Sequence, residues 1–281
     1  MKIKISMDSA CDLPPELLKR YDIDVLPMTI VHGDKTYKDG VGFTPKELFK
    51  IVEGGGACTT TAVNTAEYEE YFAACLRDYD AVIHINLSGE ISSCHQNAVI
   101  AAEGKPVYAV DSRSLSSGSG LVAVEAAEAV EGGADAETVA RGLRDISRRV
   151  ETSFVIDTLK YLHRGGRCSG LAALGANILR LKPCIEMTDG KMDVGKKYRG
   201  NIDTVILQYV KDKLAGRRGE LDARRVFMTH TYGVSDEMLA RVRETILECC
   251  PFDEIHDTVA GCTISNHSGP GTLGVLYARR G

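Results

Sequence analysis

Short apolar runs alternate with longer amphipathic segments along the first half of the chain. The run at 81–87, AVIHINL, is almost continuously apolar, which is typical of a strand buried on both faces of a parallel sheet. Segment 44–55 opens with threonine and proline and ends in glycine, which are start and stop signals of a helix. On such signals we predict strands at 2–7, 23–31, 81–87 and 106–111, a turn-rich excursion at 32–40, and helices at 12–21, 44–55, 66–79, 92–104, 118–130 and 135–150.

The alternation continues in the second half, where a hairpin interrupts it. Segment 184–200 alternates polar and apolar residues about the pair Asp189-Gly190, a favoured two-residue turn. Further strands are predicted at 152–157, 224–232, 252–260 and 273–277, and further helices at 170–181, 203–216 and 235–250. Strands that alternate with helices indicate parallel sheets, whereas a hairpin introduces antiparallel pairs. We therefore predict a two-domain α/β protein, with a three-layer α/β/α parallel-sheet domain at 1–150 and an α/β domain with a mixed sheet at 151–281.

Composition and charge argue against several classes of protein. The net charge is −5 and tryptophan is absent, so the chain offers little of the positive surface or aromatic platform that nucleic-acid binding uses. Nine cysteines without a C-x-x-C pair indicate buried thiols in a reducing compartment rather than disulfides or zinc. Residues 1–12 lack an apolar signal region, and no apolar run is long enough to span a membrane. We expect a cytoplasmic protein without nucleic-acid partner, stable membrane insertion, metal or cofactor.

Two glycine-rich segments match phosphate-binding loops only in their spacing. Gly269, Gly271 and Gly274 fit G-x-G-x-x-G, but too few residues follow them for the βαβ unit that a dinucleotide site requires. Segment 190–197 nearly spells a P-loop, but it lies in the predicted hairpin and has Lys197 where Ser or Thr would bind magnesium. We therefore expect turns at both places.

Hydroxyl and imidazole side chains gather where predicted strands meet turns or helices. Thr59, Thr60 and Thr61 precede a predicted helix, Ser88, Ser92 and Ser93 lie between a buried strand and a helix, and His267 lies at a glycine-rich turn. Helix N-termini offer free N–H groups and hydroxyls add donors, so such junctions suit an anionic oxygen group, although helix capping alone explains any single one of them. His84 falls inside an apolar strand and is expected in the core. His230 ends a strand, where ligand crevices of open α/β sheets lie, and both a structural and a ligand-binding role stay open for it.

Several short motifs, in the same order along the chain, resemble the DegV family of bacterial lipid-binding proteins. They run nearly from end to end, as DSACDLP at 8–14, VLPMTI at 25–30, TYKDG at 36–40, LHRGGRCSG at 162–170, LKP at 181–183, KKYRG at 196–200 and HSGPGTLGV at 267–275. The family includes the fatty-acid-binding subunits of bacterial fatty acid kinase. The resemblance implies two α/β domains with one fatty acid between them, its acyl tail in an apolar tunnel and its carboxylate in a polar pocket.

The resemblance also implies which residues bind the carboxylate. The family's ligand positions fall on Thr60, Ser92 and His267, and an arginine near the pocket falls on Arg167. The first three coincide with the polar junctions described above. The chain departs from the family's motifs beside Thr60 and Ser92, at Thr61, Val63, Ser93 and His95. The pocket floor next to Ser92 therefore carries a side chain larger than the family's glycine.

The remaining expectations concern the acyl tail and the role of the protein. Leu171, Leu174, Ile178 and Leu179 share one face of the predicted helix at 170–181 and are candidates to line the tail, although plain core packing explains them too. No activated nucleophile–base pair is evident in the sequence. We therefore predict a carrier, not an enzyme, that binds a long-chain fatty acid and presents its carboxylate to a separate ATP-dependent kinase, the catalytic subunit of a fatty acid kinase, which forms an acyl phosphate.

Two other interpretations stay open. The protein could be a stand-alone acyl hydrolase or transferase that uses Ser92 and His267, or a sensor of a lipid acid that works without a kinase. Lys197 and Arg199 in KKYRG are candidates for a contact with the kinase, but a solvated basic hairpin explains them equally well.

Overall fold

The computed structural model describes residues 1–168 and 181–281, and the first half of the chain builds a parallel sheet. Its strand order is β2-β1-β6-β7, formed by β1 (Ile3–Asp8), β2 (Asp24–Leu26), β6 (Ala81–Asn86) and β7 (Val107–Asp111). All neighbouring strands in it are parallel. Every residue of β6 is buried, which confirms the interpretation of its continuous apolar run.

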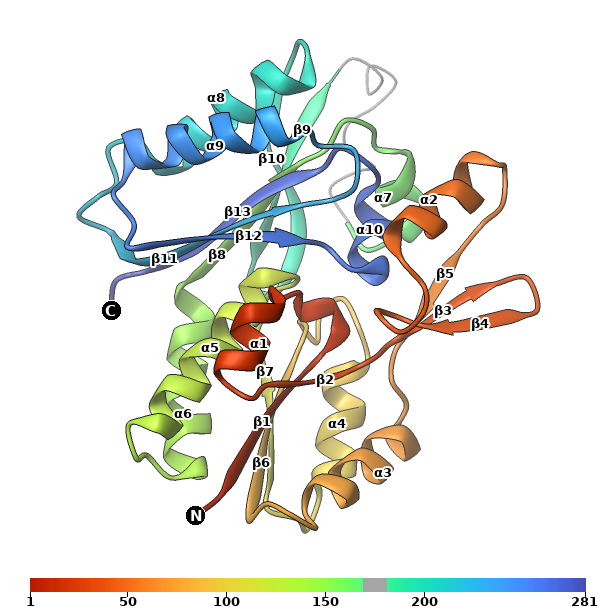
Figure 1. Ribbon diagram of the computed structural model, residues 1–281, viewed down its shortest axis with the longest axis vertical. Helices are drawn as coiled ribbons and strands as arrows, with labels where there is room; N and C mark the ends of the chain where they lie inside the picture. Colours follow the sequence, from red (N-terminus) through yellow and green to blue (C-terminus); the bar gives the residue numbers. More distant parts are fainter. Residues whose placement is uncertain (169–180) are drawn as a thin grey trace.

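Helices cover both faces of the parallel sheet (Figure 1). They are α1 (Pro15–Arg20), α3 (Thr65–Cys75), α4 (Cys94–Ala102), α5 (Ser117–Glu131) and α6 (Ala136–Arg149). Ile83 of β6 packs in one apolar core with α1, α5 and α6, whereas its neighbour Val82 packs in another with α3 and α4. Because successive strand residues point to opposite faces, the sheet lies between two helical layers, and the three-layer prediction is confirmed.

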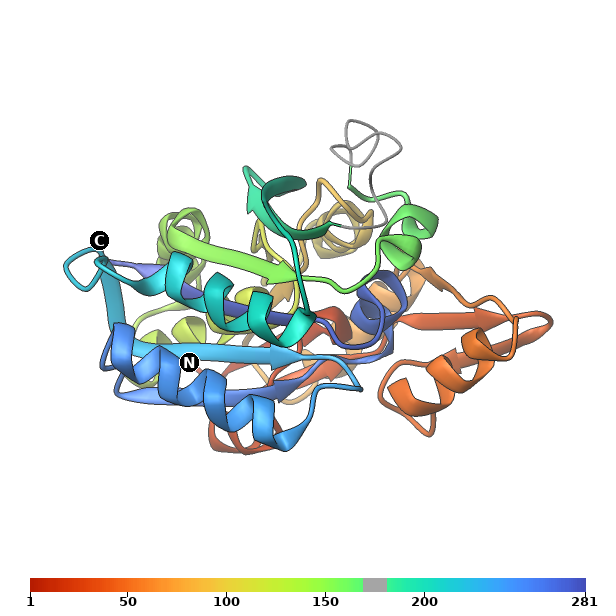
Figure 2. The same ribbon diagram turned by 90° about the horizontal axis from the view of Figure 1, so that it is seen from above.

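The second half of the chain builds a six-stranded sheet in the order β10-β9-β8-β13-β11-β12. Its strands are β8 (Val150–Val155), β9 (Lys182–Thr188), β10 (Lys191–Tyr198), β11 (Leu221–His230), β12 (Glu254–Val259) and β13 (Leu273–Arg279). β11 and β12 are parallel and the other neighbours are antiparallel, so the sheet is mixed, as predicted. Helices α8 (Ile202–Leu214) and α9 (Asp236–Cys249) lie side by side over one face of it (Figure 2).

The predicted strand at 23–31 is wrong in one respect, because it breaks at Pro27. Proline has no N–H to donate to a sheet, so the chain changes partners there. Residues after the break form β3 (Thr29–His32), which joins β4 (Lys35–Lys38) and β5 (Thr59–Thr61) in a small antiparallel sheet. This sheet and α2 (Pro45–Glu53) project from one side of the molecule (Figure 1). The predicted excursion at 32–40 is therefore partly a strand, entered through a turn in which Gly33 has a φ of 57°.

Two short helices complete the described fold, and neither was predicted. α7 (Lys160–Gly165) follows β8, and α10 (Cys262–Ser268) lies between β12 and β13 and packs against α7. Helices this short have too few turns for an apolar period to stand out in the sequence. The predicted helix at 170–181 falls almost wholly outside the described residues. No helix in the two described ranges has the length and hydropathy to cross a membrane.

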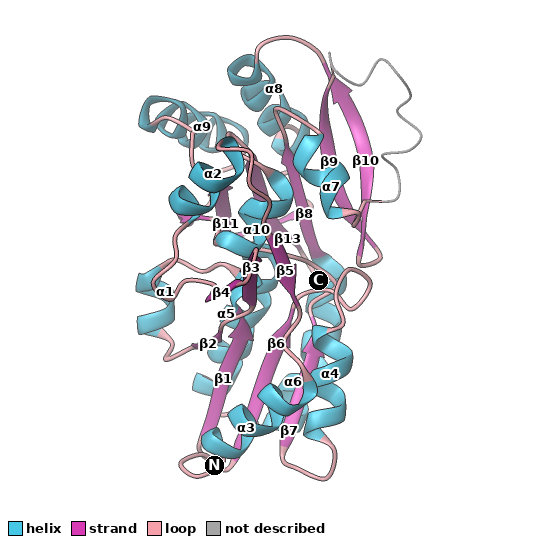
Figure 3. Cartoon of the chain, turned by 90° about the vertical axis from the view of Figure 1, so that its right-hand side faces the viewer, coloured by secondary structure: helices cyan, strands magenta, loops and turns pink. Residues whose placement is uncertain are grey.

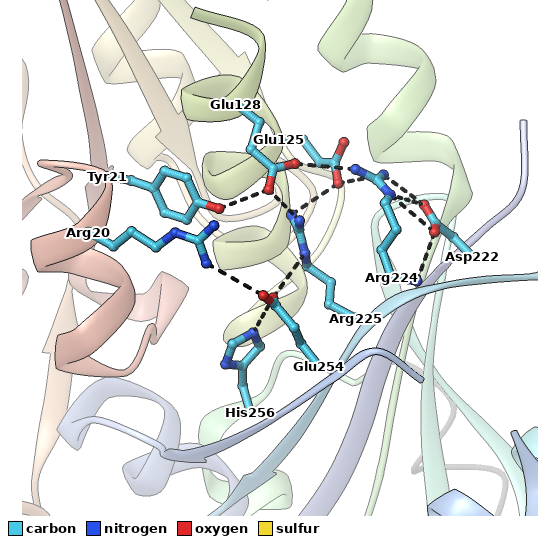
Figure 4. A network of polar contacts seen from close by, with 9 residues as sticks. All are labelled: Arg20, Tyr21, Glu125, Glu128, Asp222, Arg224, Arg225, Glu254 and His256. Carbon is cyan, nitrogen blue, oxygen red and sulfur yellow. Dashed lines mark hydrogen bonds and ion pairs between the residues drawn. The ribbon is translucent and has the colours of Figure 1, made fainter. Parts of the chain in front are cut away.

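Helix α5 connects the parallel sheet to the mixed sheet. In its first turn the Thr229 hydroxyl of β11 donates to Ser117 Oγ at 2.8 Å. Farther along α5, Glu125 lies 3.3 Å from Arg225 of β11 in a larger ion network (Figure 4). The carboxyl ends of β1 and β6 point towards the mixed sheet (Figure 3). The division of the chain into domains between residues 150 and 151 stays a prediction.

Candidate functional site

The residues expected to bind a carboxylate lie around one cavity of about 180 Å³. Thr60 comes from β5, Ser92 from the loop before α4, Arg167 from the segment after α7, and His267 from α10. These positions are far apart in the sequence. The folded chain nevertheless brings all four of them to the wall of the same cavity, between the parallel and mixed sheets.

His267 contacts Thr60 directly, with 2.8 Å between the imidazole Nε2 and the hydroxyl Oγ1. The other ring nitrogen, Nδ1, is buried and has no hydrogen-bond partner among the described residues. A buried N–H without an acceptor is rarer than a buried acceptor without a donor, so this geometry favours a proton on Nε2. Nε2 then donates to Thr60, and the hydroxyl proton of Thr60 is left free to point into the cavity.

Gly165 determines where the imidazole ring of His267 can lie. It is the last residue of α7, and a Cβ at this position would sit 2.3 Å from Nδ1 of His267. Gly166 follows with a φ of 66°, in the left-handed region that favours glycine, and ends the helix. The Nη1 group of Arg167 then donates to the carbonyl of Gly165 at 2.6 Å. Gly165, Gly166 and Arg167 of the motif thus build the wall beside His267, and Gly165 is a site residue that no pattern in the sequence had indicated.

Burial, together with the positive charges of Arg167 and Arg164, lowers the pKa of His267 to about 4. The imidazole is therefore neutral near pH 7, where an unperturbed histidine would be partly charged. His267 acts in the cavity as a neutral hydrogen-bonding group. Positive charge for an anionic ligand comes from Arg167, an exposed residue that also lines the cavity.

The lowered pKa of His267 predicts a loss of stability in acid. The unfolded chain takes up a proton on this histidine near pH 6.5, whereas the folded chain resists protonation until about pH 4, so the contribution of His267 to the free energy of unfolding falls as pH falls through this window. The decrease due to His267 amounts to about 3 kcal/mol. Denaturant unfolding at several pH values should show this slope in the difference between the parent and His267→Gln, in which the opposite contribution of Asp12, whose pKa burial raises to about 7, cancels. The exposed neighbour His163 offers a control, since His163→Gln should keep the parent slope; equal slopes in all three proteins would contradict the assignment.

Ser92 is held by its own loop in a way that leaves its hydroxyl proton available. Its Oγ accepts a hydrogen bond from the backbone N–H of Cys94 at 3.2 Å, and its own N–H donates to the carbonyl of Ser88 at 3.2 Å. The Ser88 hydroxyl donates in turn to the carbonyl of Gly190, in the β9–β10 turn, at 2.7 Å. The loop that carries Ser92 is therefore tied to the mixed sheet. Ser93, one of the departures from the family motif, also lines the cavity.

The rest of the cavity wall is mainly apolar. It is formed by Met28, Ala62, Leu87, Ile91, Leu115, Phe154, Leu162, Met192 and Ile264. A second cavity of about 30 Å³ shares Leu115, Phe154 and Ile264 with the first, so the two adjoin. The residues expected to line an acyl tail, Leu171, Leu174, Ile178 and Leu179, lie outside the described residues, and their role stays a prediction.

The other residues considered from the sequence lie away from the main cavity. His84 is fully buried in the parallel sheet and contacts Asp8 at 3.1 Å, which confirms that it is a core histidine. His230 pairs with Asp257 at 3.2 Å and lines the smaller cavity. The basic residues considered for a kinase contact are exposed, namely Lys197 and Arg199.

The fold and the site together define a class of protein. It is a two-domain α/β protein with a cavity between its sheets that is polar on one side and apolar on the other, as suits an amphipathic ligand. A family model described as "Uncharacterised protein, DegV family" matches residues 2–280, and the chain therefore belongs to the DegV family.

Relatives of known sequence and structure agree with this membership. A DegV domain-containing protein of Caldanaerobacter subterraneus is 32% identical over 282 residues, covering 99% of both chains. A fatty-acid-binding DegV family protein of Thermus thermophilus has a structure that matches with a TM-score of 0.88 at 29% identity, covering 99% of this chain and 100% of the other. A DegV lipid-binding protein of Thermotoga maritima matches with a TM-score of 0.84 at 26% identity, covering 99% of each. The Thermus and Thermotoga proteins are described as fatty-acid-binding and lipid-binding proteins, in agreement with the prediction of a carrier rather than an enzyme.

Proposed function

We propose that this protein binds a long-chain fatty acid in the cytoplasm, with the carboxylate at Thr60, Ser92, His267 and Arg167. The main support is that hydroxyl, imidazole and guanidinium groups from four separate segments surround one cavity whose remaining wall is mainly apolar. A fatty acid needs both parts of such a site. The relatives described as fatty-acid- or lipid-binding proteins support the same class of ligand.

The carboxylate is held chiefly by neutral donors. A carboxylate removed from water must accept hydrogen bonds, or it takes up a proton. Thr60 and Ser92 each keep a hydroxyl proton to donate, because their oxygens accept from His267 and from the N–H of Cys94, and His267 keeps the Thr60 hydroxyl turned towards the cavity. Arg167, an exposed residue that also lines the cavity, adds a positive charge.

Most of the binding free energy comes from the acyl tail. Burial of each CH₂ group gains about 0.8 kcal/mol, so a 16-carbon tail gains on the order of 10 kcal/mol before the cost of ordering it. Phe154, Leu162 and Ile264 line the apolar side of the cavity and form the beginning of the path for such a tail. The head group thus orients the ligand, and the tail supplies the affinity.

The bound fatty acid is presented to a separate ATP-dependent kinase, the catalytic subunit of a fatty acid kinase. That enzyme transfers the terminal phosphoryl group of ATP to a carboxylate oxygen, and ADP leaves. Within the described residues Ser92 makes no hydrogen bond to His267, and no carboxylate orients the imidazole through Nδ1. An imidazole with a pKa of about 4 is also a weak base. These features disfavour the alternative of a stand-alone hydrolase or transferase.

Native mass spectrometry and titration with palmitate and oleate test the binding. We expect the parent to hold one fatty acid, and Thr60→Ala and Ser92→Ala each to weaken binding about tenfold, the equivalent of one hydrogen bond to a charged group. Thr59→Ala is the matched control, since Thr59 is the exposed neighbour of Thr60 on β5 and should bind as the parent does. A parent that shows only its apo mass and gains no thermal stability from either acid would overturn the proposal.

A second arm of the same experiment tests the carrier role. The palmitate-loaded protein is mixed with the catalytic subunit of a bacterial fatty acid kinase and ATP, and ADP release that requires the loaded protein is expected. Hydrolysis of a p-nitrophenyl acyl ester by the protein alone, abolished in Ser92→Ala, would establish the hydrolase instead. Binding of palmitate without any kinase-dependent ADP release would favour the lipid-acid sensor.

A further inference from the structure

We propose that Asp39, assisted by Asp12, is a positioning residue for the carboxylate site, because it anchors helix α10 and thereby places His267. The inference rests on the proposed fatty-acid function and names residues that control the affinity of that site from outside it. Asp12 belongs to the motif DSACDLP and Asp39 to the motif TYKDG. Neither residue is among those that line the cavity, so neither can act by touching the ligand there.

Asp39 holds the first turn of α10 with both of its carboxylate oxygens. The N–H of Cys262 donates to Oδ1 at 2.8 Å, and the N–H of Thr263 donates to Oδ2 at 3.0 Å. The hydroxyl of Ser9 donates to the same Oδ2 at 3.1 Å. Asp39 is 3% exposed, so these bonds are made in a site from which water is largely excluded. Hydrogen bonds to a charged acceptor in such surroundings are among the stronger ones in proteins.

Asp12 holds the residue just before the helix. Its Oδ1 accepts from the N–H of Gly261 at 2.9 Å, and its Oδ2 accepts from the Ser116 hydroxyl at 2.6 Å. A Cβ on Gly261 would come 3.1 Å from Asp12 and 3.2 Å from Asp39, so the glycine lets both carboxylates approach the backbone. Burial raises the pKa of Asp12 to about 7, although the hydrogen bonds from Ser116 and Gly261 favour its charged form. For this reason Asp39 is the better residue on which to test the inference.

The other end of α10 carries His267, which meets Thr60 at 2.8 Å. The helix has seven residues, too few to be stable through its own hydrogen bonds. Its position is therefore set by what holds its ends. Asp12, Asp39 and Thr60 all come from the first part of the chain, whereas α10 belongs to the segment between β12 and β13. The two carboxylates also complement the positive end of the helix dipole.

A displacement of the first turn of α10 would be transmitted to His267. The ring has little freedom to compensate, because Gly165 packs against Nδ1 and Thr60 is bonded to Nε2. The hydroxyl of Thr60 would then lose the partner that directs its proton into the cavity. Loss of the anchor should therefore appear as weaker binding of a carboxylate, beyond any loss of stability.

Asp39→Asn tests this inference, because asparagine keeps the size and one acceptor but turns its NH₂ group towards one of the helix N–H donors. We expect the dissociation constant for palmitate, measured by titration calorimetry, to rise about tenfold. We also expect the ring signal of His267 to shift in a ¹H–¹⁵N spectrum of the imidazoles recorded without ligand. In a His267→Ala background, Asp39→Asn should add little further loss of affinity, because it acts through the histidine.

The matched control is Asp135→Asn. Asp135 caps α6 by accepting from the N–H of Thr138 at 2.9 Å. No residue of α6 lines the cavity. This variant makes the same Asp-to-Asn change at the start of another helix and should leave the affinity for palmitate and the His267 signal unchanged.

Three results would overturn the inference. They are an Asp39→Asn protein that binds palmitate like the parent, an unmoved His267 signal in that protein, and an equal loss of affinity with and without His267. If Asp39→Asn does not fold, Gly261→Ala takes its place, since its Cβ presses on both carboxylates. A parent that fails to bind palmitate would defeat the proposed function, whereas the ligand-free spectra would still decide whether Asp39 places His267.

Discussion

Replacement of Gly165 by alanine is expected to weaken fatty-acid binding roughly tenfold to a hundredfold. The added Cβ would sit 2.3 Å from Nδ1 of His267 and 3.2 Å from Cε1, so the ring must move. It cannot move without stretching the 2.8 Å contact with Thr60 that directs the hydroxyl into the cavity. Calorimetric titration with palmitate measures the effect, and a histidine signal displaced in the absence of ligand would confirm its cause.

Gly166→Ala provides the control for this substitution. Gly166 is the next residue, and its φ of 66° makes alanine unfavourable, but no atom outside its chain neighbours lies within 4 Å of the position of a Cβ. This variant should therefore lose about 1 kcal/mol of stability and bind palmitate like the parent. Equal affinities of Gly165→Ala and the parent would show that the place of the His267 ring does not determine binding.

Arg225→Met is expected to lower the free energy of unfolding by about 2 to 3 kcal/mol. The Arg225 side chain is 8% exposed and lies between Glu125 and Glu128 of α5, with which it forms ion pairs (Figure 4). Burial alone would raise the pKa of Glu128, but hydrogen bonds from Arg225 and Tyr21 hold it below its ordinary value. Without Arg225 the cation that stays paired with the two glutamates, within the described residues, is Arg224, which is 48% exposed, and Glu128 also keeps the hydrogen bond from Tyr21.

Denaturant unfolding of Arg225→Met and of a surface control measures this effect. Arg148→Met removes an arginine that is 70% exposed and lies 3.6 Å from Asp145, so it should change the free energy of unfolding by less than about 0.5 kcal/mol. Similar stabilities of the two variants would show that the network between α5 and β11 does not hold the two sheets together.

Much of the fold could be predicted because burial leaves a local pattern. The apolar run at 81–87 became a fully buried strand, and the Asp189-Gly190 turn became a hairpin in which both residues have positive φ. The prediction of one strand at 23–31 was wrong because the chain breaks at Pro27 and β3 pairs in a different sheet. The other strands of that sheet are only three or four residues long. An alternating pattern needs more residues than these to stand out.

The sequence by itself determined the α/β class and the motifs, since these depend on local periodicity and on residue types at fixed spacing. The four candidate ligand residues followed from the resemblance of those motifs to the DegV family. Only the tertiary structure decided that Thr60 and His267 lie 2.8 Å apart, that Gly165 shapes the place of the imidazole, and that Asp39 anchors α10. The physical reason is that these contacts join segments up to 224 positions apart. Their geometry depends on how sheets and helices pack, and no local pattern of polar and apolar residues records it.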